Sequence, residues 1–143
     1  MTSLTREAIM ALIPHAGAMC LLDEVLGWDD GQITCLSRRA AAPDNPLRRA
    51  GGMLGAASGI EIAAQAMALH GRLTAPAGGL LVPGYLVALR DVHLRHASLD
   101  GPLHIHATRL RGDAQGAAYS FDVSHAGAII LSGRATVLFG APS

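Results

Sequence analysis

Glu61 is the residue whose position best suits it to chemistry. It lies early in an apolar stretch, residues 59–70, whose spacing predicts a helix. A carboxylate there can act as a general acid or base, and the free N–H groups at a helix N-terminus can stabilise an oxyanion. Gln65 follows one turn later on the same side. Ser58 and Glu61 also have the spacing of a capping box, which would give the glutamate a purely stabilising role.

Seven histidines are further candidates for acid–base or metal chemistry. His15 could complete an acid–base pair only if the fold brings it to Glu61; otherwise its ring packs beside Pro14. His104 and His106 would share one face of a strand, but no third ligand stands at a spacing typical of a metal site. We therefore expect no metal, and a solvated strand face around these two histidines.

Three glycines, Gly51, Gly52 and Gly55, stand just before the predicted helix. They do not follow a strand in the pattern of a phosphate-binding loop. We interpret them as a flexible loop beside the helix start. We expect Gly51, Gly52, Ser58 and Gln65 to contact the substrate.

The elements that must position these residues follow from apolar spacing and turn signals. The pattern predicts a short helix over 4–13, strands over 19–28 and 32–39, a loop over 42–55, and a central helix over 59–70 that stops at Gly71. Extended segments follow at 80–96, 103–110, 117–124 and 128–139. One apolar helix with this much strand indicates an α+β fold, a sheet wrapped around the helix, in one domain spanning residues 1–143.

Composition excludes several classes of function. The chain has 143 residues, 50% hydrophobic and 15% charged, with a formal net charge of zero. Its mean hydropathy is +0.33, yet no stretch is long and apolar enough for a spanning helix. We therefore expect a buried interface in an oligomer. There is no basic excess for nucleic acid and no leader pattern at the start, so we expect a cytoplasmic protein.

Both cysteines are predicted to stay reduced. Cys20 and Cys35 lie on one predicted hairpin with a two-residue turn at Asp30–Gly31. That register would set Cys35 opposite Leu26. Cys20 would then be several residues out of register with Cys35, so the two sulfurs are too far apart to bond.

Four stretches resemble the 3-hydroxyacyl-(acyl carrier protein) dehydratases, which have the hotdog fold. Residues 13–15 and 19–25 (IPH and MCLLDEV) resemble that family's L-P-H-x-x-P-(F/M)-L-L-x-D-x-V opening. Residues 44–47 (DNPL) resemble its N-x-P-F loop, and residues 59–65 (GIEIAAQ) resemble its central helix, L-x-E-x-x-A-Q. The segment 85–139, with the turn at 100–103, resembles the remaining strands.

The chain departs from this family where the catalytic histidine should be. The usual G-H-F-P loop is shorter here, and its place is taken by residues 51–55 (GGMLG), with Gly52 where the histidine would stand. This pattern is similar to a divergent branch, the dehydratases encoded with aryl-polyene-type pathways. Membership of that branch implies work beside a second dehydratase subunit.

The resemblance implies elimination of water from a 3-hydroxyacyl thioester to give a trans-2-enoyl thioester. It implies that Glu61 is the acid–base carboxylate, that Gln65 supports it, and that no cofactor is used beyond the phosphopantetheine of acyl carrier protein or coenzyme A. In the ordinary family His15 would be structural, and it could replace the missing loop histidine only if the fold brings it to Glu61. Expected partners are acyl carrier protein and a second hotdog subunit in a homodimer or heterodimer. The pair Arg48–Arg49 could meet the acidic carrier protein, or it could equally lie in a solvated loop. Two alternatives stay open: a non-catalytic partner of a conventional dehydratase, and an acyl thioesterase.

Overall fold

The computed structural model describes residues 4–11, 21–38, 54–55, 58–74, 84–95, 98–99, 102–112 and 115–139. Its elements run in the order β1 (Leu4–Thr5), α1 (Arg6–Met10), β2 (Glu24–Asp29), β3 (Gln32–Ser37), β4 (Leu54–Gly55), α2 (Ser58–Leu73), β5 (Gly84–Leu94), β6 (Ser98–Leu99), β7 (Leu103–Gly112), β8 (Gly116–His125) and β9 (Ala128–Phe139). The predicted central helix and the strands on either side of it are confirmed.

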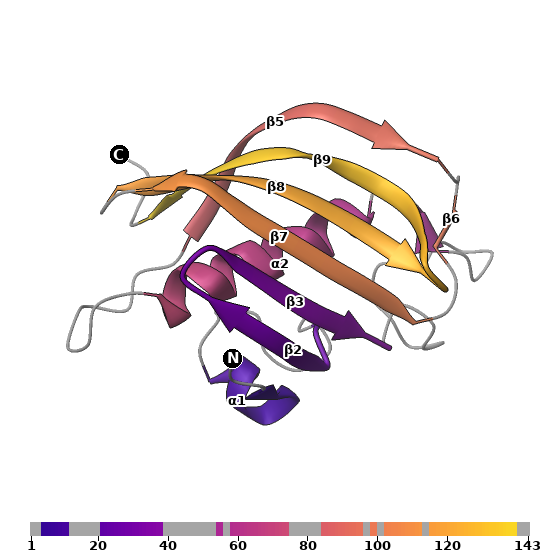
Figure 1. Cartoon of the computed structure of the whole chain (residues 1–143), viewed down its shortest axis with the longest axis horizontal. Coiled ribbons are helices and arrows are strands. Elements are labelled where there is room, and N and C mark those ends of the chain that lie inside the picture. Colours follow the sequence, from indigo (N-terminus) through magenta and orange to yellow (C-terminus); the bar gives the residue numbers. More distant parts are fainter. Residues whose placement is uncertain are drawn as a thin grey trace.

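One antiparallel sheet dominates the structure. Its strand order is β1-β2-β3-β7-β8-β9-β5, and β4 pairs separately with β6. The sheet curves around α2, which lies across its inner side (Figure 1). The two edges differ greatly in length, because β1 has two residues and β5 has eleven.

The core lies between α2 and the inner face of the sheet. Helix residues with fully buried side chains include Ile62, Ala63, Ala66, Met67 and Leu69. Two of these are alanines, so the helix backbone can lie close to the strands. Ile60 and Ala64 are partly buried and pack at the margin of this core. Apolar strand side chains complete the core and alternate with polar ones along β8, as a sheet with one buried face requires.

Tight turns join β2 to β3 and β8 to β9. At Asp30–Gly31, the carboxylate of Asp29 accepts hydrogen bonds from the N–H groups of Gly31 and Gln32, at 2.8 and 3.0 Å. These bonds hold the pKa of Asp29 below its ordinary value. The hairpin between β8 and β9 turns at Ala126–Gly127, between the predicted extended segments 117–124 and 128–139.

The predicted pairing of Cys35 is wrong by one residue. The register starts as expected, with Trp28 opposite Ile33 and Gly27 opposite Thr34, but a β-bulge follows. Cys35 therefore lies opposite Val25, and Leu26 is 42% exposed. The bulge keeps Val25 and Cys35 both buried. Cys35 is a free thiol, and Cys20 lies outside the described residues.

Three element boundaries also differ from the prediction. The first helix is shorter, because residues 4–5 form β1, which pairs with β2. The central helix does not stop at Gly71 but continues to Leu73, and the N–H of Thr74 still bonds to the carbonyl of His70 at 3.0 Å. The end of the predicted loop, Leu54–Gly55, pairs with β6.

Candidate active site

Glu61 and Gln65 form the centre of the candidate site. Both project from the N-terminal half of α2; Glu61 is half-buried, and Gln65 is only 1% exposed. The amide Nε2 of Gln65 donates to the carboxylate Oε1 of Glu61 at 3.5 Å. The two side chains predicted as catalytic and supporting therefore touch, as their spacing of one helical turn allows.

Gln65 is itself held by the backbone before β2. Its Oε1 accepts a hydrogen bond from the N–H of Leu21 at 2.9 Å. The carbonyl of Leu21 accepts a bond from the hydroxyl of Ser37, at the end of β3. Because Oε1 faces an N–H donor, the NH2 group of Gln65 must face Glu61. The amide thus links the carboxylate to the segment that leads into the sheet.

The N-terminus of α2 supplies the other chemical feature of the site. The first N–H groups of a helix have no partner within the helix, and the helix dipole makes this end positive. The preceding residues Leu54 and Gly55 pair with Leu99 and Ser98, which ties the approach to the helix to the segment after β5. A half-buried carboxylate beside this helix end can take a proton while the helix end stabilises negative charge on a nearby oxygen.

Several predicted site residues cannot be placed in this geometry. His15, Gly51 and Gly52 lie outside the described residues, and so does the pair Arg48–Arg49. Ser58 is the first residue of α2, and the description covers its backbone alone. A contact between His15 and Glu61 therefore stays a prediction.

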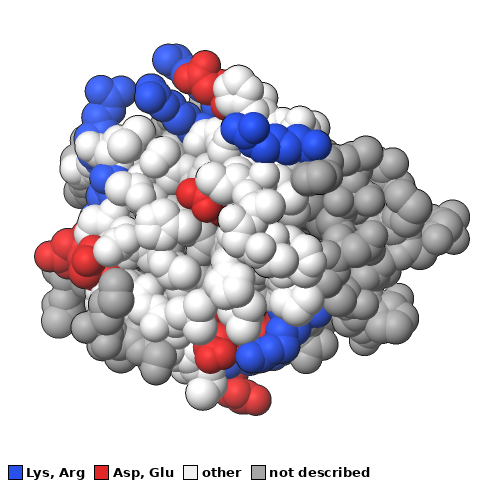
Figure 2. All heavy atoms as spheres, turned by 45° about the vertical axis from the view of Figure 1, so that its right-hand side comes forward, with Lys and Arg blue, Asp and Glu red and all other residues white. Residues whose placement is uncertain are grey.

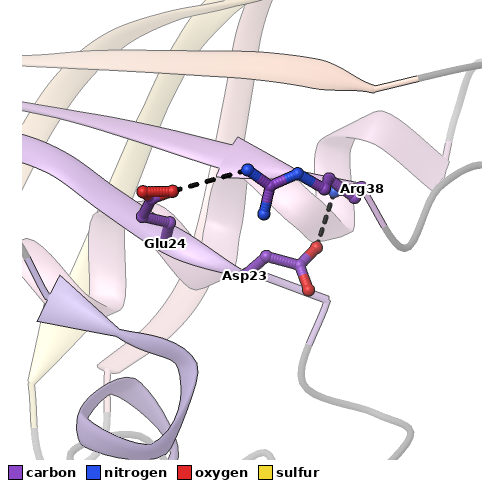
Figure 3. Close-up of polar contacts among 3 residues, drawn as sticks. All are labelled: Asp23, Glu24 and Arg38. Atoms are coloured by element: carbon purple, nitrogen blue, oxygen red, sulfur yellow. Dashed lines mark hydrogen bonds and ion pairs between the residues drawn. The ribbon is translucent and has the colours of Figure 1, made fainter.

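Asp23 and Glu24, which belong to the opening motif, join β2 to the end of β3. The Asp23 carboxylate accepts a hydrogen bond from the N–H of Arg38 at 2.6 Å, and Glu24 pairs with the Arg38 guanidinium at 3.7 Å (Figure 3). The Arg38 side chain is 63% exposed, so the ion pair contributes little to stability. The arrangement indicates a structural role for the acidic residues of this motif.

A second polar cluster, which the sequence did not reveal, lies at the other end of α2. His70 is fully buried; its Nε2 bonds to the carbonyl of Asp29 and its Nδ1 to the hydroxyl of Tyr119, both at 2.7 Å. Arg109 donates to the hydroxyls of Thr74 and Tyr119 at 2.7 and 3.3 Å. The cluster fastens the C-terminal end of α2 to β2, β7 and β8.

The hydrogen bonds of this cluster fix the protonation of His70. A carbonyl can only accept, so Nε2 carries the hydrogen, and Nδ1 accepts from Tyr119 in the neutral ring. Burial lowers the pKa of His70, although the Asp29 carbonyl opposes that shift, and burial raises the pKa of Tyr119. Both groups are therefore neutral near pH 7, which indicates a structural role for this cluster.

The residues that the structure describes contain no group of three or more His, Cys, Asp or Glu side chains able to hold a metal ion. His106 lies on the strand face away from α2, where its Nδ1 is 2.9 Å from the hydroxyl of Thr34 and its Nε2 is 3.3 Å from that of Thr108. His104 is exposed on the same face. Both occupy the polar strand face expected from the sequence.

The fold has well-matched relatives among solved structures. One is the dehydratase heterocomplex ApeI:P from Xenorhabdus doucetiae, with TM-score 0.79 and 22% identity over 96% of this chain and 92% of that one. Others are a thioesterase from Haemophilus influenzae (TM-score 0.69, 14% identity, 95% and 90% covered) and zebrafish thioesterase superfamily member 2 (0.68, 19%, 96% and 99%). These likenesses establish the expected α+β hotdog fold.

The sequence itself was compared with curated proteins and with protein families. No curated protein matches the sequence. Among the helices in the described part of the chain, none is long and apolar enough to cross a membrane. The family model described as ApeP dehydratase matches residues 7–141, nearly the whole chain. The chain therefore belongs to the ApeP-like dehydratase family.

Proposed function

We propose that this chain removes water from a 3-hydroxyacyl thioester, with Glu61 as its acid–base residue. The observation that carries the proposal is the contact between the Gln65 amide and the Glu61 carboxylate in a chain of a dehydratase family. The amide directs the carboxylate, and the nearby helix end offers N–H groups for the thioester oxygen. No cofactor is needed for this elimination.

The proposed chemistry balances without a redox partner. A carboxylate takes the proton from the carbon next to the thioester carbonyl, and the thioester oxygen gains negative charge that N–H groups stabilise. The electron pair then forms the carbon–carbon double bond as the hydroxyl leaves, protonated, as water. We propose His15 as the second proton carrier, because Gly52 stands where the family's loop histidine would be.

The acyl group is proposed to arrive on phosphopantetheine, attached either to acyl carrier protein or to coenzyme A. The reaction can be followed by intact mass spectrometry of a 3-hydroxyacyl carrier protein incubated with the purified chain. We expect loss of one water with the wild type, no loss with Glu61→Gln, and full activity with the control Glu7→Gln, which alters an exposed glutamate of α1. Activity retained in Glu61→Gln would refute the assignment, and release of free acid would indicate a thioesterase.

A second candidate function is a partner subunit that supports a conventional dehydratase. Gly52 in place of the histidine favours it, and the similar structure from Xenorhabdus doucetiae is described as a heterocomplex. We propose that the partner, a second copy or another hotdog chain, docks along β5. Among the described strands, β5 forms one edge of the sheet, and Val87, Leu89 and Leu94 on it are 52%, 39% and 54% exposed.

The partner hypothesis has its own test. Val87→Lys should weaken assembly, whereas the matched change Leu110→Lys, at a residue 52% exposed on β7, should not. Light scattering, with and without a co-encoded dehydratase, measures the change. Water loss only when the partner is present, unaffected by Glu61→Gln, would assign this chain the supporting role.

A further inference from the structure

The outer face of the sheet, turned away from α2, carries a pocket lined by three arginines. Along β9, Arg134 and Thr136 alternate with the buried residues Ala135 and Val137, so the first two point outward. Arg90 on β5 and Arg111 on β7 line the same hollow, whose volume is about 350 Å³. All three arginine side chains are exposed.

The strand register places these positive charges unfavourably close. Arg90 lies directly opposite Arg134 in the antiparallel pair β5–β9, and like charges in that position repel. Arginine keeps its charge at all ordinary pH values, so deprotonation cannot relieve this repulsion. An anion bound between the two guanidinium groups would.

No protein carboxylate supplies that anion within the described part of the chain. The residues that line the pocket include no Asp or Glu, and no ion pair joins these arginines to a described carboxylate. Asp91 follows Arg90 and is exposed, while Asp122 lies opposite His106 and Ser132 instead. In the space-filling view, arginine side chains gather at the upper left of the molecule, with fewer acidic ones among them (Figure 2).

The floor of the pocket is small and has a polar group. Ala118 lies opposite both Arg111 and Thr136, and Thr136 lies opposite Ala88, so the row of residues that begins at Arg111 continues with two alanines and a threonine. A ligand can thus reach down between the long arginine side chains. Guanidinium forks match the oxygens of a phosphate group and bind them with paired, charge-assisted hydrogen bonds.

The hollow continues into a neighbouring one. A second depression of about 300 Å³ shares Arg111, Ala118 and Thr136 with the first and extends to Gly116 and Leu138. A Cβ at Gly116 would lie 2.5 Å from the carbonyl oxygen of Val137, so only glycine fits there. Leu138 is 47% exposed. The charged pocket therefore has an adjoining, less polar trough that can hold the organic part of a ligand.

We propose that this arginine pocket binds the phosphate group of a phosphate ester, whose organic part lies in the adjoining trough. Two sources share this chemistry, a phosphopantetheine arm and the nucleotide portion of coenzyme A. The choice of these two sources rests on the proposed function, whereas the pocket itself lies on the opposite side of the sheet from α2 and Glu61.

The test is a titration calorimetry experiment with matched ligands that differ only in phosphate. Phosphopantetheine is compared with pantetheine, and adenosine 3′,5′-bisphosphate with adenosine, using the whole chain. We expect binding in at least one pair to need the phosphate, and Arg90→Ala or Arg134→Ala to weaken it about tenfold or more. Arg95→Ala, which removes an equal charge from an exposed residue just after β5, should have no such effect. The pair that shows the difference identifies the source.

A second measurement keeps the proposal testable if affinity is low. In phosphate-free buffer, Arg90→Ala or Arg134→Ala should have a higher melting temperature than the wild type, because the repulsion between the two arginines is relieved. Inorganic pyrophosphate should raise the melting temperature of the wild type more than that of Arg134→Ala. Equal binding with and without phosphate in both pairs, or binding unchanged in Arg90→Ala and Arg134→Ala, would overturn the site. Because Glu61→Gln leaves the pocket intact, phosphate binding that persists in this variant separates the site from the fate of the proposed reaction.

Discussion

Replacing Gln65 by methionine tests whether one buried amide holds the candidate site together. Methionine has a similar length and a similar helix propensity, so the change removes the polar group and little else. The buried N–H of Leu21 then loses the acceptor that it contacts at 2.9 Å. Leaving such a group unsatisfied costs about 1–3 kcal/mol.

The bond from Gln65 to Glu61 adds little to this stability cost. Its length of 3.5 Å, at the limit of hydrogen bonding, indicates a weak contact. The total corresponds to a melting temperature lower by roughly 3–10 °C for a chain of this size. Activity should fall further than stability explains when it is assayed well below the melting temperature, because the carboxylate is no longer directed.

The control for this prediction is Gln32→Met. Among the described residues, its side-chain amide bonds to the exposed Asp29 carboxylate at 3.3 Å, so the free energy of unfolding should change by less than about 0.5 kcal/mol. A third variant, Gln65→Glu, keeps an acceptor for Leu21 but places a second carboxylate beside Glu61. Repulsion between the two neighbouring carboxylates should make this variant less stable than the wild type. An unchanged melting temperature in Gln65→Met would refute the reasoning.

Three further predictions concern buried groups. Tyr119→Phe should leave Nδ1 of His70 without its donor and lower the free energy of unfolding, measured by calorimetry, by about 1–3 kcal/mol. Water elimination well below the melting temperature should be unaffected. Unchanged stability would contradict the hydrogen bond between Tyr119 and His70. Because burial lowers the pKa of His70 in the folded protein, the unfolded chain takes up the proton first as the pH falls through the ordinary value of 6.5. Urea unfolding should therefore show lower stability at pH 5.5 than at pH 7.5, and this loss should be smaller in His70→Gln. Burial raises the pKa of Cys35 to about 12, so in a Cys20→Ala variant the remaining thiol should resist iodoacetamide at pH 8 until guanidinium unfolds the chain. Rapid labelling of the folded protein would contradict this prediction and show that the thiol is accessible.

Local patterns were enough to predict most of the fold. The apolar spacing of residues 59–70 predicted α2, and the turn at Asp30–Gly31 predicted the hairpin of β2 and β3. The fold class also followed, because one helix among many strands has few ways to bury its apolar face. Gln65 was predicted from the motif around Glu61, and the two side chains do meet.

Features that depend on distant contacts were not predictable. Gly71 reads locally as a helix end, yet α2 continues because His70 and Thr74 near its end bond to Tyr119 and Arg109, residues from β8 and β7. These partners lie 49 and 35 residues away in sequence, and no spacing rule joins them. The β-bulge that places Cys35 opposite Val25 also depends on tertiary packing, because it buries both of these side chains in the core and leaves Leu26 exposed.

The turn between β8 and β9 has a consequence for how the protein folds. Ala126 has φ 51° and Gly127 has φ 84°, and a left-handed conformation costs a residue other than glycine about 1–2 kcal/mol. Alanine here lacks the side-chain hydrogen bond that asparagine uses to favour this turn. The connection is therefore a poor starting point for chain closure. The hairpin must draw its stability from cross-strand pairs such as Phe121 with Gly133. We therefore expect pairing of the two strands to precede formation of the turn during folding.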